Sequence, residues 1–375
     1  MENKILLNIG IPTCNRARFL ENLLNNILPQ AVKTEGEVKI CISDNGSTDN
    51  TEQIVAKFRD KFPGLVNYNK NPKNLGFDRN ILKVMEMSQG EFVWLLGDDD
   101  LTADGALEEV INFIKKNKRE EIGLVFLETE SYFIDEKTNQ KIVWSKKLNK
   151  GKPAIFEIDR KDIIGISLPG INFMSALVIN NKLLKEIFKE DEAAIKKAIG
   201  NFHIHMILLS LMFSKYPRIK GFVLNKRPLI NQELFYHKLF VEDEFMLHYR
   251  AQKRIRDLLL SYEHMDNSCT SSIIKIDKKL RRGFIVNMII MRAFKNFNYF
   301  SFFGCLKLFF QEAVFIDALV FSFIFLVLFL APPAVLSFLY KVLLMIKHGK
   351  KWKFKWDAES YISSVIAKAE KREAL

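Results

Sequence analysis

Strand-like and helix-like segments alternate through the first 123 residues of this 375-residue chain. Runs typical of buried strands occupy residues 5–11, 38–43, 65–69 and 92–96. Segments with apolar residues at helical spacing occupy residues 17–28, 50–62, 80–88 and 106–116. Parallel strands are joined by crossover connections that are usually helices. The alternation therefore predicts an α/β fold with a mostly parallel central sheet and helices on both of its faces.

The composition is that of a folded protein, with 48% hydrophobic and 27% charged residues. Such a chain has enough apolar surface to offset its conformational entropy, which excludes wholesale disorder. The cysteines Cys14, Cys41, Cys269 and Cys305 lack metal-ligand spacing, so we expect buried thiols rather than a zinc site or a disulfide scaffold. The net charge of +12 indicates a phosphate-bearing partner, which leaves nucleic acid, an anionic bilayer and a nucleotide as classes to separate.

Three consecutive carboxylates follow the most apolar of these strands. The strand at residues 92–96 leads directly into Gly97 and then Asp98, Asp99 and Asp100. Adjacent carboxylates repel one another unless a cation lies among them. Mg²⁺ and Mn²⁺ prefer oxygen ligands and usually bridge protein carboxylates to substrate phosphates. A solvated loop or a helix N-cap is the alternative, but the position after a buried strand favours a divalent-cation site.

A second polar segment follows the first strand. Pro12 is expected to end that strand and to free the backbone groups that follow it. Thr13 and Asn15 can bond the edge of a nucleotide base, and Arg16 can bond a phosphate. A simple Pro-Thr turn is the alternative. In open parallel sheets ligands bind beyond the carboxyl ends of the strands, which is where this segment lies.

Two further polar segments have the same relation to the predicted sheet. Asp44 follows the second strand and can accept hydrogen bonds from a ribose or a base, while Ser47 or Thr48 can cap the next helix. In the segment NLGFDRN, Gly76 allows a close backbone approach and Arg79 can face a ribose or a phosphate. A polar loop that starts a helix explains the segment NLGFDRN equally well.

The four segments PTCNR, SDNGSTDN, NLGFDRN and LLGDDD together resemble, in order and spacing, the N-terminal half of a family 2 glycosyltransferase. The resemblance covers residues 4–109 and continues more loosely to residue 213. The segments NLGFDRN and LGDDD look most like the abequosyltransferase-like branch, which builds bacterial O-antigen and capsular polysaccharides. The resemblance implies the Rossmann-like GT-A fold, a nucleotide-diphosphate-sugar donor, for which a UDP-sugar is favoured, and Mn²⁺ or Mg²⁺ as cofactor.

Matched residue by residue, the resemblance also implies roles for individual side chains. The residues expected to bind the nucleotide are Pro12, Thr13, Asn15, Arg16, Asp44, Arg79, Asp98 and Asp99. Those expected to meet the metal ion are Asp98, Asp99 and Asp100. Gly97 stands where the family usually has its first Asp, so the functional pair is either Asp98 with Asp100 or Asp99 with Asp100.

The general base is the point at which the sequence departs most from the family. An inverting enzyme of this type needs a base near the acceptor hydroxyl, usually an acidic residue that starts a helix. In the helix at residues 202–213 that position holds His205, which can act as a base near neutral pH. Asp191 or Glu192 is the alternative base, and a half-buried structural role for His205 is equally consistent with the pattern. His203 should point to another helix face and share no metal with His205.

The later part of the chain has a different character. Further strands are expected at 124–130, 141–145 and 172–179, and a further helix at 182–188. We divide the chain into a glycosyltransferase domain at 1–233, a helical extension at 234–315, a membrane-associated helix pair at 316–347 and a basic, aromatic tail at 348–375. Residues 318–340 form an uncharged run that is long enough to enter or cross a bilayer. Pro332-Pro333 breaks this run.

These features favour a lipid partner over nucleic acid, because lysines alternate with tryptophans directly after an uncharged run. We expect a membrane-associated glycosyltransferase at the cytoplasmic face of the bacterial inner membrane, facing an anionic membrane surface. Its acceptor would be a lipid-linked glycan carried on polyprenyl diphosphate. A nucleotidyltransferase and a non-catalytic glycan-binding or scaffold module are the alternatives, and the oligomeric state is left open.

Overall fold

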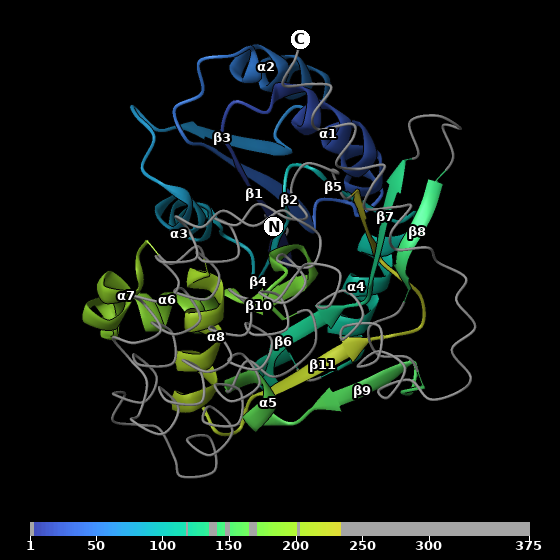
Figure 1. The fold of residues 1–375 in the computed structure, drawn as a ribbon, viewed down its shortest axis with the longest axis vertical. Helices are drawn as coiled ribbons and strands as arrows, with labels where there is room; N and C mark the ends of the chain where they lie inside the picture. The colour runs from blue at the N-terminus through green and yellow to red at the C-terminus, as the bar shows by residue number, and fades with distance from the viewer. Residues whose placement is uncertain are drawn as a thin grey trace, which may run out of the picture. The chain divides into compact units, whose positions relative to one another are not determined.

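The computed structural model of the protein describes residues 4–117, 119–134, 141–146, 151–164, 171–200 and 203–233, all of which belong to the first of the two units of the chain (Figure 1). The centre is an eight-stranded sheet with the strand order β3-β2-β1-β4-β10-β6-β11-β9. Its first half consists of β1 (Leu7–Thr13), β2 (Val38–Asp44), β3 (Val66–Lys70) and β4 (Phe92–Leu95). These four strands are parallel, since β1 pairs in parallel with both β2 and β4, and β2 pairs in parallel with β3.

The second half of the sheet contains two strands of opposite direction. It consists of β10 (Leu177–Asn180), β6 (Ile122–Leu127), β11 (Lys220–Leu224) and β9 (Ile155–Ile158). β10 is antiparallel to both β4 and β6, and β9 is antiparallel to β11 at the edge. Six of the eight strands therefore run in one direction, which confirms the predicted α/β fold with a mostly parallel sheet.

Helices cover both faces of the sheet. One apolar cluster joins the sheet to α1 (Ala17–Val32), α2 (Thr51–Lys61) and α4 (Ala106–Lys116). A second cluster joins it to α3 (Phe77–Met87), α5 (Arg160–Ile164), α6 (Asn181–Glu190), α7 (Glu192–Ala198) and α8 (Ile204–Lys215). In β4, Phe92 and Trp94 belong to the first cluster, whereas Val93 and Leu95 belong to the second. The uninterrupted apolar run before the acidic turn thus reflects burial on both faces.

A small second sheet lies beyond the acidic turn. Its order is β5-β12-β7-β8, formed by β5 (Asp100–Thr102), β12 (Ile230–Glu233), β7 (Thr129–Ile134) and β8 (Lys141–Lys146). Two short helical turns, η1 (Arg119–Glu121) and η2 (Met174–Ala176), precede β6 and β10. The predicted strand at 124–130 is therefore two strands, which separate at Glu128 and join different sheets.

Two prolines lie inside elements: Pro12, which was expected to end its strand, and Pro29, which directly follows the helix predicted at 17–28. Pro12 is within β1, and β1 pairs with β4 only as far as Gly10 opposite Leu95. Beyond that point Pro12 has no β4 residue opposite it, so its missing N–H removes no bond to that strand. Pro29 lies in the last turn of α1, which continues to Val32. Burial of the apolar face on both sides of Pro29 holds the helix together in spite of one lost backbone bond.

No helix in the described part of the chain is long and apolar enough to cross a membrane. The helical extension expected at 234–315, the helix pair expected at 316–347 and the tail expected at 348–375 all lie outside the described residues.

Candidate functional site

The carboxyl ends of β1, β2 and β4 bring the predicted site residues to one edge of the sheet. Thr13 lies opposite Asp44 in the β1–β2 register, and the backbone N–H of Asn45 donates to the Thr13 carbonyl at 2.8 Å. β4 ends at Leu95 on the other side of β1, directly before the acidic turn. The parallel pairing therefore places residues that are about 30 and 85 positions apart in the chain side by side.

The PTCNR segment holds the acidic turn directly. The Thr13 hydroxyl donates to Asp98 Oδ2 at 2.7 Å. Arg16 forms two ion pairs, from Nε to Asp98 Oδ1 at 3.0 Å and from Nη2 to Asp99 Oδ2 at 2.5 Å. Asp98 is almost fully buried, and its side chain is 6% exposed. The buried carboxylate is thus compensated by a hydroxyl and a guanidinium from β1 and the residues after it.

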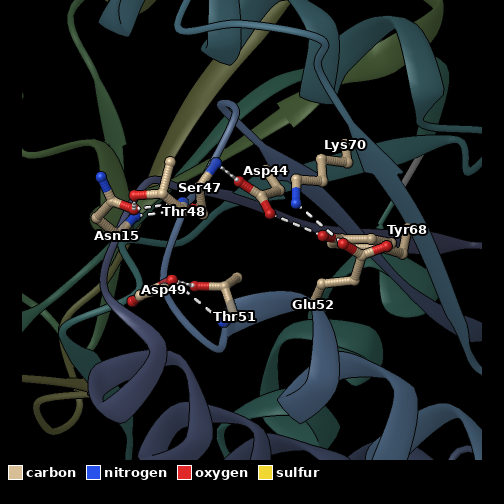
Figure 2. A network of polar contacts seen from close by, with 9 residues as sticks. All are labelled: Asn15, Asp44, Ser47, Thr48, Asp49, Thr51, Glu52, Tyr68 and Lys70. Atoms are coloured by element: carbon tan, nitrogen blue, oxygen red, sulfur yellow. Dashed lines mark hydrogen bonds and ion pairs between the residues drawn. The ribbon is translucent and has the colours of Figure 1, made fainter.

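Asp44 is the centre of a second network, shown in Figure 2. Its Oδ1 accepts the backbone N–H of Ser47 at 2.8 Å, and its Oδ2 accepts the hydroxyl of Tyr68, on β3, at 2.7 Å. Burial and this bond to Asp44 raise the pKa of Tyr68 well above its usual value, so Tyr68 remains a neutral donor. Asp44 is fully buried. Its carboxylate is therefore held in one orientation, with lone pairs left over to accept from a ligand.

The loop at Asn15 is joined to the same turn. The backbone N–H of Asn15 donates to Ser47 Oγ at 2.8 Å, and Asn15 Oδ1 accepts the backbone N–H of Thr48 at 2.7 Å. Asn15 has a φ of 53°, a left-handed conformation that Asn tolerates better than most residues. Ser47 or Thr48 was expected to cap α2. Both residues instead bond the loop after β1.

Asp49 bonds the first residue of two helices. Its Oδ1 accepts the backbone N–H and the hydroxyl of Thr51, at 3.1 and 2.5 Å, at the start of α2. Its Oδ2 accepts the backbone N–H of Ala17, at 3.1 Å, at the start of α1. Partial burial raises the pKa of Asp49, but the bonds from Thr51 and Ala17 outweigh this effect and lower it. The first and second strand ends are thus fixed to each other by one carboxylate.

Asp100 is held by a different partner, Ser175. Its Oδ2 accepts the hydroxyl of Ser175 at 2.5 Å, and the same Ser175 oxygen accepts the backbone N–H of Gly97 at 2.8 Å. Burial and the neighbouring Asp99 raise the pKa of Asp100 well above its usual range. A Cβ atom on residue 97 would lie 2.8 Å from Asp100 Oδ2 and 3.2 Å from Ser175 Oγ. The glycine in the position of the family's first Asp therefore makes room for this contact.

This donor set fits a divalent cation that is shared with a phosphate. Among the described residues, no three His, Cys, Asp or Glu side chains lie close enough together to hold a metal ion. Asp98 and Asp99 converge on Arg16, whereas Asp100 is engaged with Ser175. Mg²⁺ is usually held by one or two carboxylates together with substrate phosphates. Asp98 and Asp99, which Arg16 joins, could supply such a pair of oxygen ligands.

His205 is buried in the first turn of α8. Its Nε2 lies 3.0 Å from the carbonyl oxygen of Asn172, and no described residue is a hydrogen-bond partner of its Nδ1. Burial lowers the pKa of His205 to about 4, while the Asn172 carbonyl and Asp78 oppose that shift. The imidazole is therefore neutral at pH 7 and a weak base. The ring also meets that of His203 edge-on, with centroids 5.8 Å apart, because His203 precedes the helix and its backbone is not helical.

Asp191 does not belong to α8, but its side chain lies beside the last residue of that helix. It separates α6 from α7, and its Oδ2 lies 3.3 Å from Nζ of Lys215, the last residue of α8. Ten residues separate His205 from Lys215, which corresponds to about 15 Å along a helix. Glu192 is exposed and paired with Lys196 at 2.7 Å. The structure therefore places His205 and Asp191 near opposite ends of α8.

Arg79 is not joined to these networks, whereas two residues absent from the prediction are. The Arg79 side chain is exposed on α3 and makes no hydrogen bond or ion pair with another described residue. Tyr68 lies in a segment that was predicted only as a strand. Ser175 lies inside an apolar run, where no local pattern distinguishes it from its neighbours. Only the pairing of distant strands reveals that Tyr68 orients Asp44 and that Ser175 orients Asp100.

Comparison with known proteins finds a family match that includes the strand ends of the candidate site. Residues 8–176 match the profile of the family described as glycosyl transferase family 2. These residues form a family 2 glycosyltransferase domain. The matched region includes every site residue on β1, β2, α3 and the acidic turn, as well as Ser175. The family prediction is thereby confirmed for this part of the chain, while the two predicted bases lie outside it.

Curated relatives of the family 2 domain agree with the predicted branch. Over 103 residues the chain is 41% identical to abequosyltransferase RfbV of Salmonella typhimurium, covering 28% of this chain and 31% of that protein. Over 213 residues it is 28% identical to the GalNAc(5)-diNAcBac-PP-undecaprenol beta-1,3-glucosyltransferase of Campylobacter jejuni, covering 53% of this chain and 62% of that protein. The chain thus spans about a third to three fifths of the length of these two relatives.

Solved structures agree with the GT-A-like fold. Staphylococcus aureus TarS 1–349 in complex with UDP-GlcNAc has a TM-score of 0.51 and 18% identity, over 72% of this chain and 70% of that chain. The mannosyltransferase PcManGT from Pyrobaculum calidifontis, in complex with GDP-Man and Mn²⁺, has a TM-score of 0.50 and 12% identity, over 94% of this chain and 88% of that chain. At these identities the likeness concerns the fold.

Proposed function

We propose that this protein is a glycosyltransferase that moves a sugar from a nucleotide-diphosphate sugar to a glycan acceptor in the assembly of a bacterial polysaccharide. One observation carries the proposal: Thr13 and Arg16 bond the Asp98 and Asp99 carboxylates at the edge where Asp44 also lies. Asp44, which suits a nucleoside, and the Asp98–Asp99 carboxylates, which suit a cation-bound diphosphate, thus lie at one edge of the family 2 domain.

The donor would lie along this edge with its nucleoside near Asp44. Thr13 and Asn15 border that end of the site, and the held carboxylate of Asp44 can accept from a base or a ribose. Asp98 and Asp99 would hold Mn²⁺ or Mg²⁺, which when bound neutralises charge on a departing diphosphate. A UDP-sugar is favoured because TarS is described with UDP-GlcNAc, although PcManGT is described with GDP-Man and Mn²⁺.

His205 is the better placed of the two candidate bases. The Asn172 carbonyl that bonds its Nε2 lies three residues before Ser175, which contacts the acidic turn. Asp191 has no such connection and is paired with Lys215 instead. A neutral imidazole can take a proton, but its low pKa makes it a weak base. Substitution of His205 should therefore lower the rate of transfer more than the affinity for the donor.

We further propose a lipid-linked acceptor on polyprenyl diphosphate and attachment to the cytoplasmic face of the bacterial inner membrane. Support comes from the uncharged run at 318–340 with its adjacent lysines and tryptophans. The Campylobacter jejuni relative is named for an acceptor on undecaprenyl diphosphate. An enzyme held at a bilayer gains effective concentration for an acceptor in that bilayer.

The test begins with a thermal-shift panel of UDP-, GDP-, CDP- and dTDP-sugars on the full chain, with and without Mn²⁺. A donor that binds only the folded state raises the Tm. The bound donor is then assayed for transfer and for the released nucleotide. Free nucleoside diphosphate supports a glycosyltransferase, whereas pyrophosphate would indicate a nucleotidyltransferase.

Variants connect the result to the site. Asp98→Asn should abolish cation-dependent nucleotide binding and transfer, because it removes the carboxylate that Thr13 and Arg16 hold. Asp60→Asn, on the exposed face of α2, is the matched control and should behave as the wild type. Full transfer by Asp98→Asn would contradict the assignment of the acidic turn.

A further inference from the structure

Arg16 joins the two carboxylates to which the proposed function assigns the cation. Its Nη2 donates to Asp99 Oδ2 at 2.5 Å, and its Nε forms an ion pair with Asp98 Oδ1 at 3.0 Å without a well-aligned hydrogen bond. The second oxygen of Asp98 is bonded by the Thr13 hydroxyl. One oxygen of each carboxylate is thus paired with the guanidinium, and the second oxygen of Asp98 is also engaged.

The surroundings allow this side chain to leave while its backbone stays in place. The Asn15 loop before it is tied to Ser47 and Thr48, and α1 begins with the next residue. The Arg16 side chain is 28% exposed, and its guanidinium lies over the ring of Phe19, 4.7 Å from the centroid. A long side chain with one exposed flank can change rotamer without disturbing the strand.

We propose that Arg16 acts as an internal counter-cation of Asp98 and Asp99. It hinders the binding of a free divalent cation to these two carboxylates, and it releases them when a cation binds together with the donor diphosphate. The inference rests on the proposed function. A divalent cation must approach carboxylate oxygens to about 2.0–2.2 Å, and it repels a guanidinium that is paired with the same two carboxylates.

A diphosphate changes this balance because it brings negative charge for both cations. The divalent ion bridges the carboxylates and the phosphates, while the guanidinium finds a new partner in a phosphate, which it can bind through two N–H groups. Cation and nucleotide then bind as a pair, each increasing the affinity for the other by the same factor. Arg16 is the residue through which the two are coupled.

The test measures Mn²⁺ binding to the full chain without nucleotide, from the EPR signal of free Mn²⁺. We expect Arg16→Gln to bind Mn²⁺ at least ten-fold more tightly than the wild type. Arg18→Gln is the matched control, since Arg18 is an exposed arginine two residues away that loses the same charge. Arg16→Gln with Asp98→Asn should lose the gain. Equal Mn²⁺ affinity in Arg16→Gln and Arg18→Gln would overturn the proposal.

A second measurement guards against a variant that folds poorly. Arg16→Gln leaves the two carboxylates without their internal cation, so its Tm should fall in EDTA and recover on addition of Mn²⁺. Arg16→Lys keeps the charge but loses the forked geometry, and its Mn²⁺ affinity should lie between those of the wild type and Arg16→Gln. A Tm of Arg16→Gln that Mn²⁺ does not raise would also count against the proposal.

The coupling itself is measured by repeating the titration with UDP. In the wild type UDP should increase Mn²⁺ affinity by a larger factor than in Arg16→Gln, and an equal factor would contradict the inference. A wild-type protein that binds no nucleotide and releases no nucleoside diphosphate would refute the proposed function. The nucleotide-free comparison of Arg16→Gln with Arg18→Gln would still decide the role of Arg16.

Discussion

Ser175→Ala tests whether the acidic turn is held from the β10 side. The hydroxyl of Ser175 bonds Asp100 Oδ2 and Gly97 N–H in a fully buried position. Its loss leaves the Gly97 N–H without a partner, which costs about 1–3 kcal/mol, and removes a bond to Asp100 worth about 1 kcal/mol. The free energy of unfolding should therefore fall by about 2–4 kcal/mol. The backbone stays anchored, since the Trp94 indole N–H still donates to the Ser175 carbonyl at 2.8 Å.

The assay is urea unfolding of the full chain at pH 7, with Ser210→Ala as the matched control. Ser210 is equally buried but makes one bond, from its hydroxyl to the Ile164 carbonyl at 2.9 Å, so its loss should amount to about 1 kcal/mol. Ser175→Ala should also weaken Mn²⁺ binding in the presence of UDP, which Ser210→Ala should not affect. Equal losses of stability and unchanged Mn²⁺ affinity would refute the reasoning.

Three further predictions concern titration, orientation and reactivity. With a pKa lowered to about 4 in the folded state, His205 should make stability fall as the pH drops from about 6.5 to 4, by about 3 kcal/mol, and His205→Gln should lack this component in urea unfolding across that range. Tyr68→Phe should weaken UDP binding about ten-fold in calorimetry, since it removes the donor that orients a buried carboxylate, whereas Tyr216→Phe, which loses a hydroxyl elsewhere, should not. Burial and nearby carboxylates raise the pKa of the half-buried Cys14, and burial raises the pKa of Cys41 to about 11. Iodoacetamide at pH 7.5 should therefore label Cys14 slowly and Cys41 more slowly still, as measured by peptide mass spectrometry. UDP should protect Cys14 from labelling. A pH profile unchanged in His205→Gln, equal UDP affinity in both tyrosine variants, or labelling of Cys14 unaffected by UDP would contradict the respective prediction.

The parallel half of the fold could be predicted because its signals are local. Each strand of that half is a short run between helix-forming segments, and a parallel sheet follows from the crossover helices. The prolines were misplaced because their effect depends on neighbours that the sequence does not show. Pro12 lies where β4 no longer pairs with β1, and Pro29 lies in a turn held by burial.

The site divides in the same way. The contact between PTCNR and the acidic turn follows from strand ends that meet at one edge, so the sequence pattern anticipated it. Ser175 could not be found, because β10 inserts between β4 and β6 in the antiparallel direction and brings a residue from far along the chain beside Asp100. The burial that makes His205 a weak base likewise depends on packing around α8 rather than on its own neighbours.

The short segment before β10 has a mechanical consequence. Its Ser175 is bonded to Asp100 of β5, and its Asn172 is bonded to His205 of α8, so side chains of two different elements are tied to one chain stretch of four residues. If a bound donor displaced the acidic turn, these two bonds would carry the displacement to the imidazole. Readiness to accept a proton would then be set by whether a donor is present, which would limit wasteful hydrolysis in its absence.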